Sequence, residues 1–292
     1  MQGTSSTVVW VYKYKWETPT TNVESLGTKA AEAVRTIRAR LTLRGFKDQD
    51  RGDVDRYAGT SSRVAQKLIV SEAVRQKRVL LTTDISKAFL QGVTYKELSE
   101  LTGKPMREVN FYLPMSNVHL LRQVPGFESF DPQKEVLHCD KPGTGLVDAL
   151  RAFTMKLSLV TRDKCGLIPS KVDPELCMRH DNGAHTCIMT KHVDDLKIAG
   201  RHDIVKYIIK QLQDVFGELK VIQGDFTNCG VRHVQCPKTF EVALDQIAFA
   251  SNLRLIAHTQ VSSGKNDDLC DAPASIVYVI AWSHCLFGSY QT

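Results

Sequence analysis

Three aspartates in this sequence could support metal-assisted chemistry. Asp194 and Asp195 are adjacent and lie between two β-rich runs at 186–193 and 196–199. Two neighbouring negative charges repel each other unless something positive lies beside them. A Mg²⁺ ion is one such group, because it binds carboxylate oxygens together with substrate phosphates. The alternative is a polar hairpin turn, since aspartate is favoured in tight turns without any metal.

The third aspartate, Asp84, ends the β-rich run 78–84 (RVLLTTD), and apolar residues resume directly after it. An acid at the end of one buried strand and two acids at a neighbouring hairpin could converge on a pair of ions. Two ions held in this way clamp the attacking and leaving oxygens of a phosphoryl transfer. The sequence therefore predicts a two-metal site built from Asp84, Asp194 and Asp195.

Apolar periodicity predicts the elements that must position these acids. Residues 36–44 alternate between apolar and polar, which predicts a strand with one apolar face and one face carrying Arg38, Arg40 and Arg44. Helices are predicted over 62–75, with an apolar stripe of Val64, Leu68, Ile69 and Val74, and also over 145–162 and 202–216. The mixture of helices and hairpins favours an α+β fold over a parallel βαβ array.

The overall composition is that of a soluble, basic protein. The chain has 292 residues, is 42% apolar and carries a net charge of +6, which suits a soluble protein with polyanionic partners. No apolar run is long enough to span a bilayer, so no membrane partner is expected. The eight cysteines include no CxxC pair, which is typical of reduced thiols inside the cell. Cys229, His233 and Cys236 match no standard zinc spacing, so packing is the preferred interpretation.

Several segments resemble copia-type long-terminal-repeat retrotransposon reverse transcriptases, in the same order along the chain. The two strongest are Asp84-Ile-Ser-Lys-Ala-Phe-Leu-Gln-Gly92, which is similar to the first catalytic motif, and His192-Val-Asp-Asp-Leu-Lys-Ile-Ala-Gly200, which is similar to the second. The others are 38–46, like the basic strand of the fingers, and 145–153, 173–177, 216–220 and 228–232. Each motif alone is weak, but the ordered set covers roughly residues 36–235 and makes a chance match untenable.

This resemblance implies a fold, an activity and a set of partners. The fold would be a right-hand polymerase with fingers and palm and a short or incomplete thumb. Residues 1–30 would form a loosely ordered arm, 31–250 the fingers and palm, and 251–292 a remnant of the connection or thumb. The chain would be an RNA-directed DNA polymerase that binds an RNA template, a DNA or RNA primer and deoxynucleoside triphosphates (dNTPs).

The resemblance also implies roles for individual residues. Asp84, Asp194, Asp195 and the Ile85 carbonyl would hold two Mg²⁺ ions, with Mn²⁺ as a substitute. Phe89 would screen the nucleotide sugar, unless it only packs in the core. The remaining nucleotide-binding residues would be Arg38, Arg40, Arg44, Gly145 and Lys220. Primer and template would contact His192, Val193 and Gly230.

Departures from the family pattern leave alternatives open. His192 replaces the usual tyrosine beside the primer terminus, and Thr144 and Leu150 replace an aromatic residue and a proline. A diverged domain that binds nucleic acid without catalysis, or a decayed element copy, is therefore the competing interpretation. No protease, integrase or ribonuclease H pattern is present, which suggests one domain of a longer pol polyprotein. The expected location is the cytoplasm, a cytoplasmic particle or the nucleus.

Overall fold

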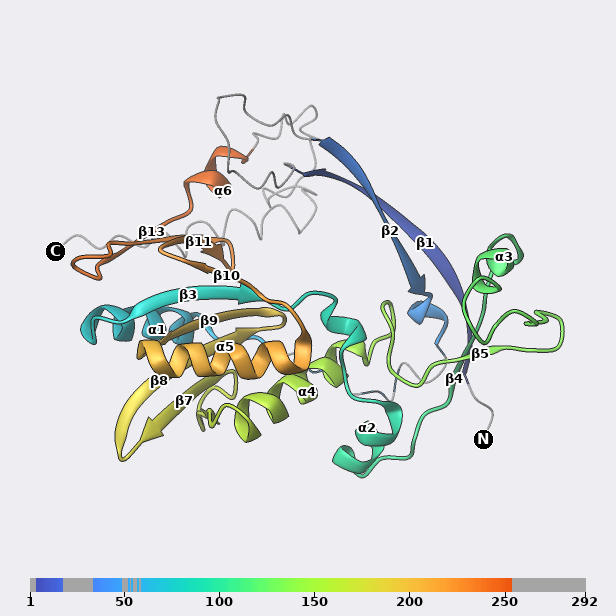
Figure 1. Cartoon of the computed structure of the whole chain (residues 1–292), viewed down its shortest axis with the longest axis horizontal. Helices are drawn as coiled ribbons and strands as arrows, with labels where there is room; N and C mark the ends of the chain where they lie inside the picture. The colour runs from blue at the N-terminus through green and yellow to red at the C-terminus, as the bar shows by residue number, and fades with distance from the viewer. Residues whose placement is uncertain are drawn as a thin grey trace, which may run out of the picture. The chain divides into compact units, whose positions relative to one another are not determined.

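The computed structural model describes residues 4–17, 34–48, 52, 54, 57 and 59–253 (Figure 1). The chain divides into two compact units, Met1–Gln246 and Ile247–Thr292. In the second unit the described part is helix α6 (Ile247–Ser251) and the two residues after it. Most of the predicted connection or thumb segment, 251–292, therefore lies outside the described residues.

The largest sheet in the described residues has six strands, and every neighbouring pair in it is antiparallel. Its order is β10-β3-β9-β8-β7-β6. The bounds are β3 (Val79–Asp84), β6 (Ile168–Pro169), β7 (Leu176–Asp181), β8 (Ala184–His192), β9 (Asp195–Gly200) and β10 (Lys220–Gln223). Antiparallel strands combined with long helices confirm the α+β class.

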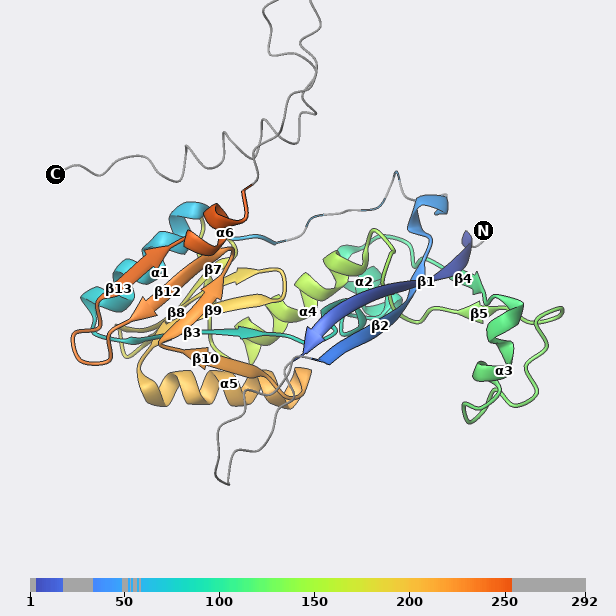
Figure 2. The same cartoon turned by 90° about the horizontal axis from the view of Figure 1, so that it is seen from above.

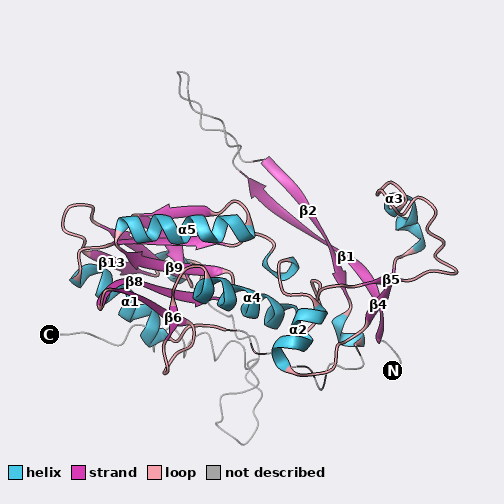
Figure 3. Cartoon of the chain, turned by 60° about the horizontal axis from the view of Figure 1, so that its bottom comes forward, coloured by secondary structure: helices cyan, strands magenta, loops and turns pink. Residues whose placement is uncertain are grey.

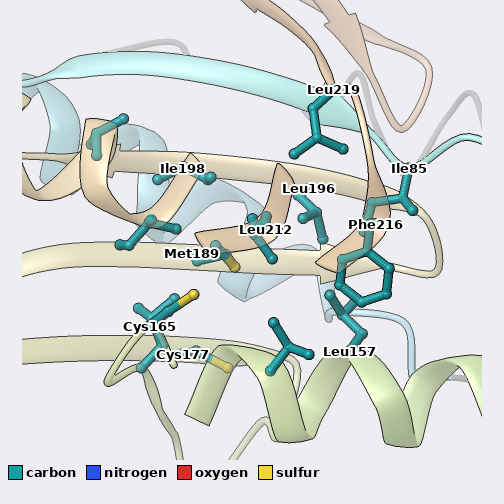
Figure 4. Packing of buried hydrophobic residues seen from close by; sticks show 14 of the residues in the cluster. Ile85, Leu157, Cys165, Cys177, Met189, Leu196, Ile198, Leu212, Phe216 and Leu219 are labelled. Carbon is teal, nitrogen blue, oxygen red and sulfur yellow. The ribbon is translucent and has the colours of Figure 1, made fainter. Parts of the chain in front are cut away.

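Helices cover both faces of this sheet, as the two views in Figures 1 and 2 show. Helices α4 (Ala149–Asp163) and α5 (His202–Phe216) pack on one face, where their side chains meet Met189, Leu196 and Ile198 (Figure 4). Helix α1 (Arg63–Arg75) packs on the other face, against Leu80, Ile188 and Ala199. Side chains alternate between the two faces along each strand. The α1 face therefore carries the even-numbered residues of β3 and β8 and the odd-numbered residues of β9.

All three predicted helices are present, but the buried face of α1 differs from the predicted one. Helix α5 has the predicted bounds, and α1 begins after Ser62, whose side chain accepts a hydrogen bond from the Ala65 N–H. The predicted apolar stripe of α1 is wrong at Val64, which is 75% exposed, and at Leu68, which is 45% exposed, but it is confirmed at the buried Ile69. The small residues Ala65 and Ala73 are buried instead, together with Ile69 and Val70. They let the helix approach the sheet closely.

A second sheet contains a long antiparallel ribbon. Strands β1 (Thr4–Glu17) and β2 (Val34–Leu43) pair from Val8 opposite Leu43 to Glu17 opposite Val34, and we call these paired segments the β1–β2 ribbon. The sheet order is β2-β1-β4-β5, with β4 (Val109–Tyr112) parallel to β1 and β5 (Leu137–His138) antiparallel to β4. The expected loose arm of residues 1–30 is therefore wrong for residues 4–17. Its alternating aromatic and β-branched residues favour a strand.

Smaller elements complete the first unit. Strands β11 (Asp225–Asn228), β12 (Val231–Gln235) and β13 (Val242–Asp245) form a three-stranded sheet that contributes Phe226 to the core beneath α1. The short helices are η1 (Gly45–Lys47), η3 (Ala88–Leu90), α2 (Tyr95–Thr102), η4 (Met115–Asn117) and α3 (Val118–Leu121), and Figure 3 separates helices from strands by colour. No helix in the described ranges has the length and apolar character that crossing a bilayer requires.

Candidate active site

One transverse row of the six-stranded sheet contains four of the predicted site residues. Lys220, Asp84, Asp195 and His192 are consecutive cross-strand partners on β10, β3, β9 and β8. Directly opposed residues point to the same face, with Cβ atoms about 4.5–5.5 Å apart. The strand register therefore places Asp84 beside Asp195, although the two are far apart in the sequence.

Asp194 joins this row through the β8–β9 turn. The turn has two central residues, Val193 and Asp194, between the partners His192 and Asp195. The N–H of Ile85 donates to the Asp194 carbonyl oxygen over 3.2 Å, so the residue after Asp84 is tied to the turn. Val193 has φ +60°, a conformation that costs a β-branched residue energy and that glycine normally adopts in such turns. Backbone strain of this kind is concentrated at functional sites.

The strained turn is supported from the segment before α1. The Val193 N–H donates to the Gly59 carbonyl oxygen over 3.1 Å, and the Ser61 N–H donates to the Lys191 carbonyl oxygen over 2.9 Å. Beneath this contact the Lys191 ammonium lies 3.0 Å from a Glu175 carboxylate oxygen, and both side chains are almost fully buried. Lys191 also donates to the Ser158 hydroxyl of α4. These contacts hold the turn on both sides.

The carboxylates of the row interact electrostatically. Burial raises the pKa of Asp84, and the Asp194 charge raises it further. Burial likewise raises the pKa of Asp195, with added contributions from Asp194 and Asp84, and the nearby His192 opposes this rise. A cation placed among the three carboxylates would relieve their mutual repulsion.

The donor atoms are those that Mg²⁺ prefers. Asp84, Asp194 and Asp195 offer only oxygen ligands, and the Ile85 carbonyl could add another. In the described part of the chain, no three His, Cys, Asp or Glu side chains could by themselves hold a metal ion. An ion that takes one or two carboxylates and completes its shell with water and phosphate oxygens does not require such a group. The donor chemistry is therefore that of a magnesium ligand set, but the described carboxylates do not form a metal-holding group by themselves.

Phe89 and the three predicted arginines are not members of the cross-strand row. Phe89 is in η3, which begins four residues after Asp84, and its side chain is 36% exposed. Arg38 and Arg40 are exposed on β2, and Arg44 follows the end of that strand. None of these three arginines is a register partner of the acidic row.

Gly145 has an evident packing role. Its φ is +101°, and an added Cβ would lie 2.1 Å from the Leu43 carbonyl oxygen at the end of β2. The neighbouring Thr144 carbonyl oxygen accepts a hydrogen bond from the Leu43 N–H over 2.9 Å. The helix predicted to start at Gly145 begins at Ala149, because residues 145–148 form this crossing instead.

Gly230 occupies the two-residue turn between β11 and β12. Cys229 and Gly230 have φ +50° and +76°, the combination of a type I′ hairpin turn. On the strand after this turn, His233 is stacked on Phe226 with ring centroids 4.9 Å apart. His233 is thus a packed core residue, as the sequence interpretation favoured.

Sequence reasoning missed Lys197, which lies two positions from Asp195 on the same face of β9. Its side chain is 2% exposed, and burial lowers its pKa to about 8. The Lys197 Nζ lies 3.1 Å from His233 Nε2, and burial together with the Lys197 charge lowers the pKa of His233 to about 4. A lysine within an apolar run was the available signal, since buried lysines are rare.

Comparisons with known proteins give only weak likenesses. No protein-family model matches the sequence, and no curated protein matches it. A telomerase structure from Candida albicans, in complex with a fragment of telomeric RNA, is 10% identical with a TM-score of 0.38, covering 80% of this chain and 44% of that one. An RNA-dependent RNA polymerase of a human picobirnavirus, an insertion-loop deletion mutant, is 10% identical with a TM-score of 0.34, covering 79% and 44%. At these scores the likenesses carry no argument, and this chain spans less than half of either structure.

Proposed function

We propose that this chain is the polymerase core of a copia-type reverse transcriptase, an RNA-directed DNA polymerase. The observation that carries the proposal is the cross-strand row, in which Asp84 stands opposite Asp195 and beside the turn that bears Asp194. The ordered motifs of the sequence supply the family, and the register supplies a geometry compatible with it. The six-stranded sheet with α1, α4 and α5 would be the palm, and the sheet containing the β1–β2 ribbon would belong to the fingers.

The residues of the row have separable tasks in this proposal. Asp84, Asp194, Asp195 and the Ile85 carbonyl hold two divalent ions, Mg²⁺ or Mn²⁺. When bound, such ions activate the primer 3′-hydroxyl and stabilise the pyrophosphate leaving group. Lys220 offsets negative charge or donates a proton to that leaving group, a role supported by its register opposite Asp84. His192, opposite Asp195, contacts the primer end with Val193, and Gly230 adds a backbone contact.

Nucleotide selection falls to residues outside the row. Phe89 screens the 2′ position of the incoming sugar, and its 36% exposure leaves part of the ring accessible for that role. Arg38, Arg40 and Arg44 contact the triphosphate or the template backbone, since guanidinium groups pair well with phosphate oxygens. Gly145 is linked to the arginines of β2 only through its contact with Leu43 at the end of that strand.

Primer extension by the wild type and by Asp194→Asn tests the proposal. The substrate is poly(rA)/oligo(dT) with deoxythymidine triphosphate and Mg²⁺ or Mn²⁺. The substitution keeps the side-chain volume but removes one metal-binding charge, so extension should fall by several orders of magnitude. Binding of the template-primer should change little, because it depends on lysines and arginines.

Two outcomes would contradict this assignment in different ways. A wild type that binds the template-primer without extending it would favour the domain that binds nucleic acid without catalysis. Extension by Asp194→Asn at the wild-type rate would show that the metal ligands are assigned incorrectly.

A further inference from the structure

The β1–β2 ribbon has an aromatic face that the proposed chemistry does not use. Its register pairs Trp10 with Leu41, Tyr12 with Ala39 and Tyr14 with Ile37. Because direct partners share a face, these six side chains lie on one side of the ribbon. The opposite side carries the pairs Val11–Arg40 and Lys13–Arg38. The sequence predicted the basic face, but it did not indicate the row of rings behind it.

The aromatic face is partly covered at Trp10 and open beyond it. Tyr12 is 65% exposed, Tyr14 is 59% exposed and Ile37 is 62% exposed. The rings of Trp10 and Tyr12 are stacked, with centroids 6.4 Å apart and an interplanar angle of 23°. Exposed contiguous apolar surface of this kind marks a site of interaction.

The charge of the ribbon indicates the kind of partner. The Arg35 guanidinium lies 3.7 Å from the centroid of the Tyr14 ring, so a cation is present on the aromatic face itself. In sequence the two strands carry one acidic residue, Glu17, against five basic ones: Lys13, Lys15, Arg35, Arg38 and Arg40. A second copy of the ribbon would bring like charges together, whereas a polyanion would be attracted.

We propose that this face binds single-stranded RNA, with successive bases stacked on Trp10, Tyr12 and Tyr14 and Arg35 beside the backbone. Aromatic rings interleaved with cations are the usual means of holding single strands without sequence preference. Bases within a duplex are already stacked on each other, so the occupant is a single strand. The inference rests on the proposed function only in identifying that strand as the template ahead of the duplex.

The test measures equilibrium binding of a short labelled oligouridine by fluorescence anisotropy. All proteins carry Asp194→Asn, so binding is measured without any extension. Tyr12→Leu with Tyr14→Leu keeps the surface apolar but removes two rings, and it should weaken binding by about tenfold or more. Tyr12→Phe with Tyr14→Phe keeps the rings and should bind as the parent does. Affinity for a blunt RNA–DNA hybrid should be the same in all three proteins.

The contrary results are distinct from a failure of the polymerase assignment. Unchanged oligouridine binding by the double leucine variant would overturn the inference, even if the wild type extends primers. A drop in self-association with unchanged RNA binding, measured by sedimentation, would assign the face to a second copy and also overturn it. The wild type could fail to extend primers while the double leucine variant still loses affinity for oligouridine. That result would support the stacking surface and contradict only the polymerase assignment.

Discussion

The six-stranded sheet and the β1–β2 ribbon hold their candidate functional side chains in different environments. In the sheet, Lys191 and Lys197 are buried close to the acidic row, and each has a specific partner, Glu175 or His233. Along the ribbon, Arg40 and Tyr12 are exposed on opposite faces. Buried ionisable groups affect the stability of the fold as well as the site, whereas exposed groups affect binding alone.

This contrast predicts that the two regions tolerate substitutions differently. A metal site requires carboxylates held in one geometry, and packing on both faces of the sheet restrains the strands that carry Asp84 and Asp195. A surface that reads single strands without sequence preference requires rings and charge but no fixed arrangement. We therefore expect substitutions to cause large losses of stability in the sheet and graded losses of affinity in the ribbon.

The largest effect on stability is expected for Gly59→Ala. The added Cβ would lie 2.0 Å from a Glu175 carboxylate oxygen, and a shift of that carboxylate would break its ion pair with the buried Lys191, leaving Lys191 only its hydrogen bond to Ser158. Breaking a buried ion pair costs about 3–5 kcal/mol, which should appear as a lower free energy of unfolding in urea. Gly52→Ala is the matched control, because its Cβ would meet no atom within 4 Å and should change stability by less than about 0.5 kcal/mol. Equal results for the two variants would contradict the tight packing inferred beneath the turn.

A smaller effect on the sheet region is expected from acid. The pKa of His233 is about 4 in the folded protein against 6.5 as the ordinary value, so between these values the unfolded chain binds more protons. Stability should therefore fall as pH decreases through this window, with His233 contributing about 3 kcal/mol by pH 4. The raised pKa values of Asp84 and Asp195 act in the opposite direction, so the test is a difference between proteins.

The comparison protein for this titration is His233→Gln, which has no ring to protonate but can still accept a hydrogen bond from Lys197. Urea unfolding at several values between pH 6.5 and 4 should give a shallower dependence on pH for the variant than for the wild type. Parallel curves would mean that His233 is not buried against Lys197 in solution.

The smallest effect is expected in the ribbon. Arg40→Gln removes one exposed charge, so affinity for template-primer should fall by less than about tenfold, and the slope of log affinity against log salt should become shallower by about one unit. The free energy of unfolding should stay within about 0.5 kcal/mol of the wild type. Arg162→Gln is the control, because Arg162 is also exposed but is paired with Asp163 at the end of α4. A large loss of stability in Arg40→Gln would remove the distinction between the two regions.

Local pattern in the sequence was sufficient to predict several elements. The four-residue repeat of apolar side chains predicted α5 with its observed bounds, and the two β-rich runs around Asp194 predicted the β8–β9 hairpin. The α+β class followed from the mixture of these elements. Such features depend on backbone periodicity over neighbouring residues, which a single sequence contains.

Other features required contacts between distant residues. The stripe of α1 was predicted on Val64 and Leu68, but close approach to the sheet selected Ala65 and Ala73. The alternation within β1 favours a strand locally, but its pairing with β2 joins residues that are far apart in the sequence. In α1 the tertiary environment determined which face is covered, and in the ribbon it determined which strands pair; periodicity alone specifies neither choice.

The candidate site divides in the same way. The amino-acid sequence determined the presence of Asp84, Asp194 and Asp195, their order and the β-rich runs that carry them. Tertiary structure alone decided that Asp84 stands opposite Asp195 with Lys220 on its other side, because strand register depends on pairings between residues far apart in the chain. It also decided that Lys197 is buried and that Tyr12 is exposed, since burial is set by what packs against each face rather than by the residue itself.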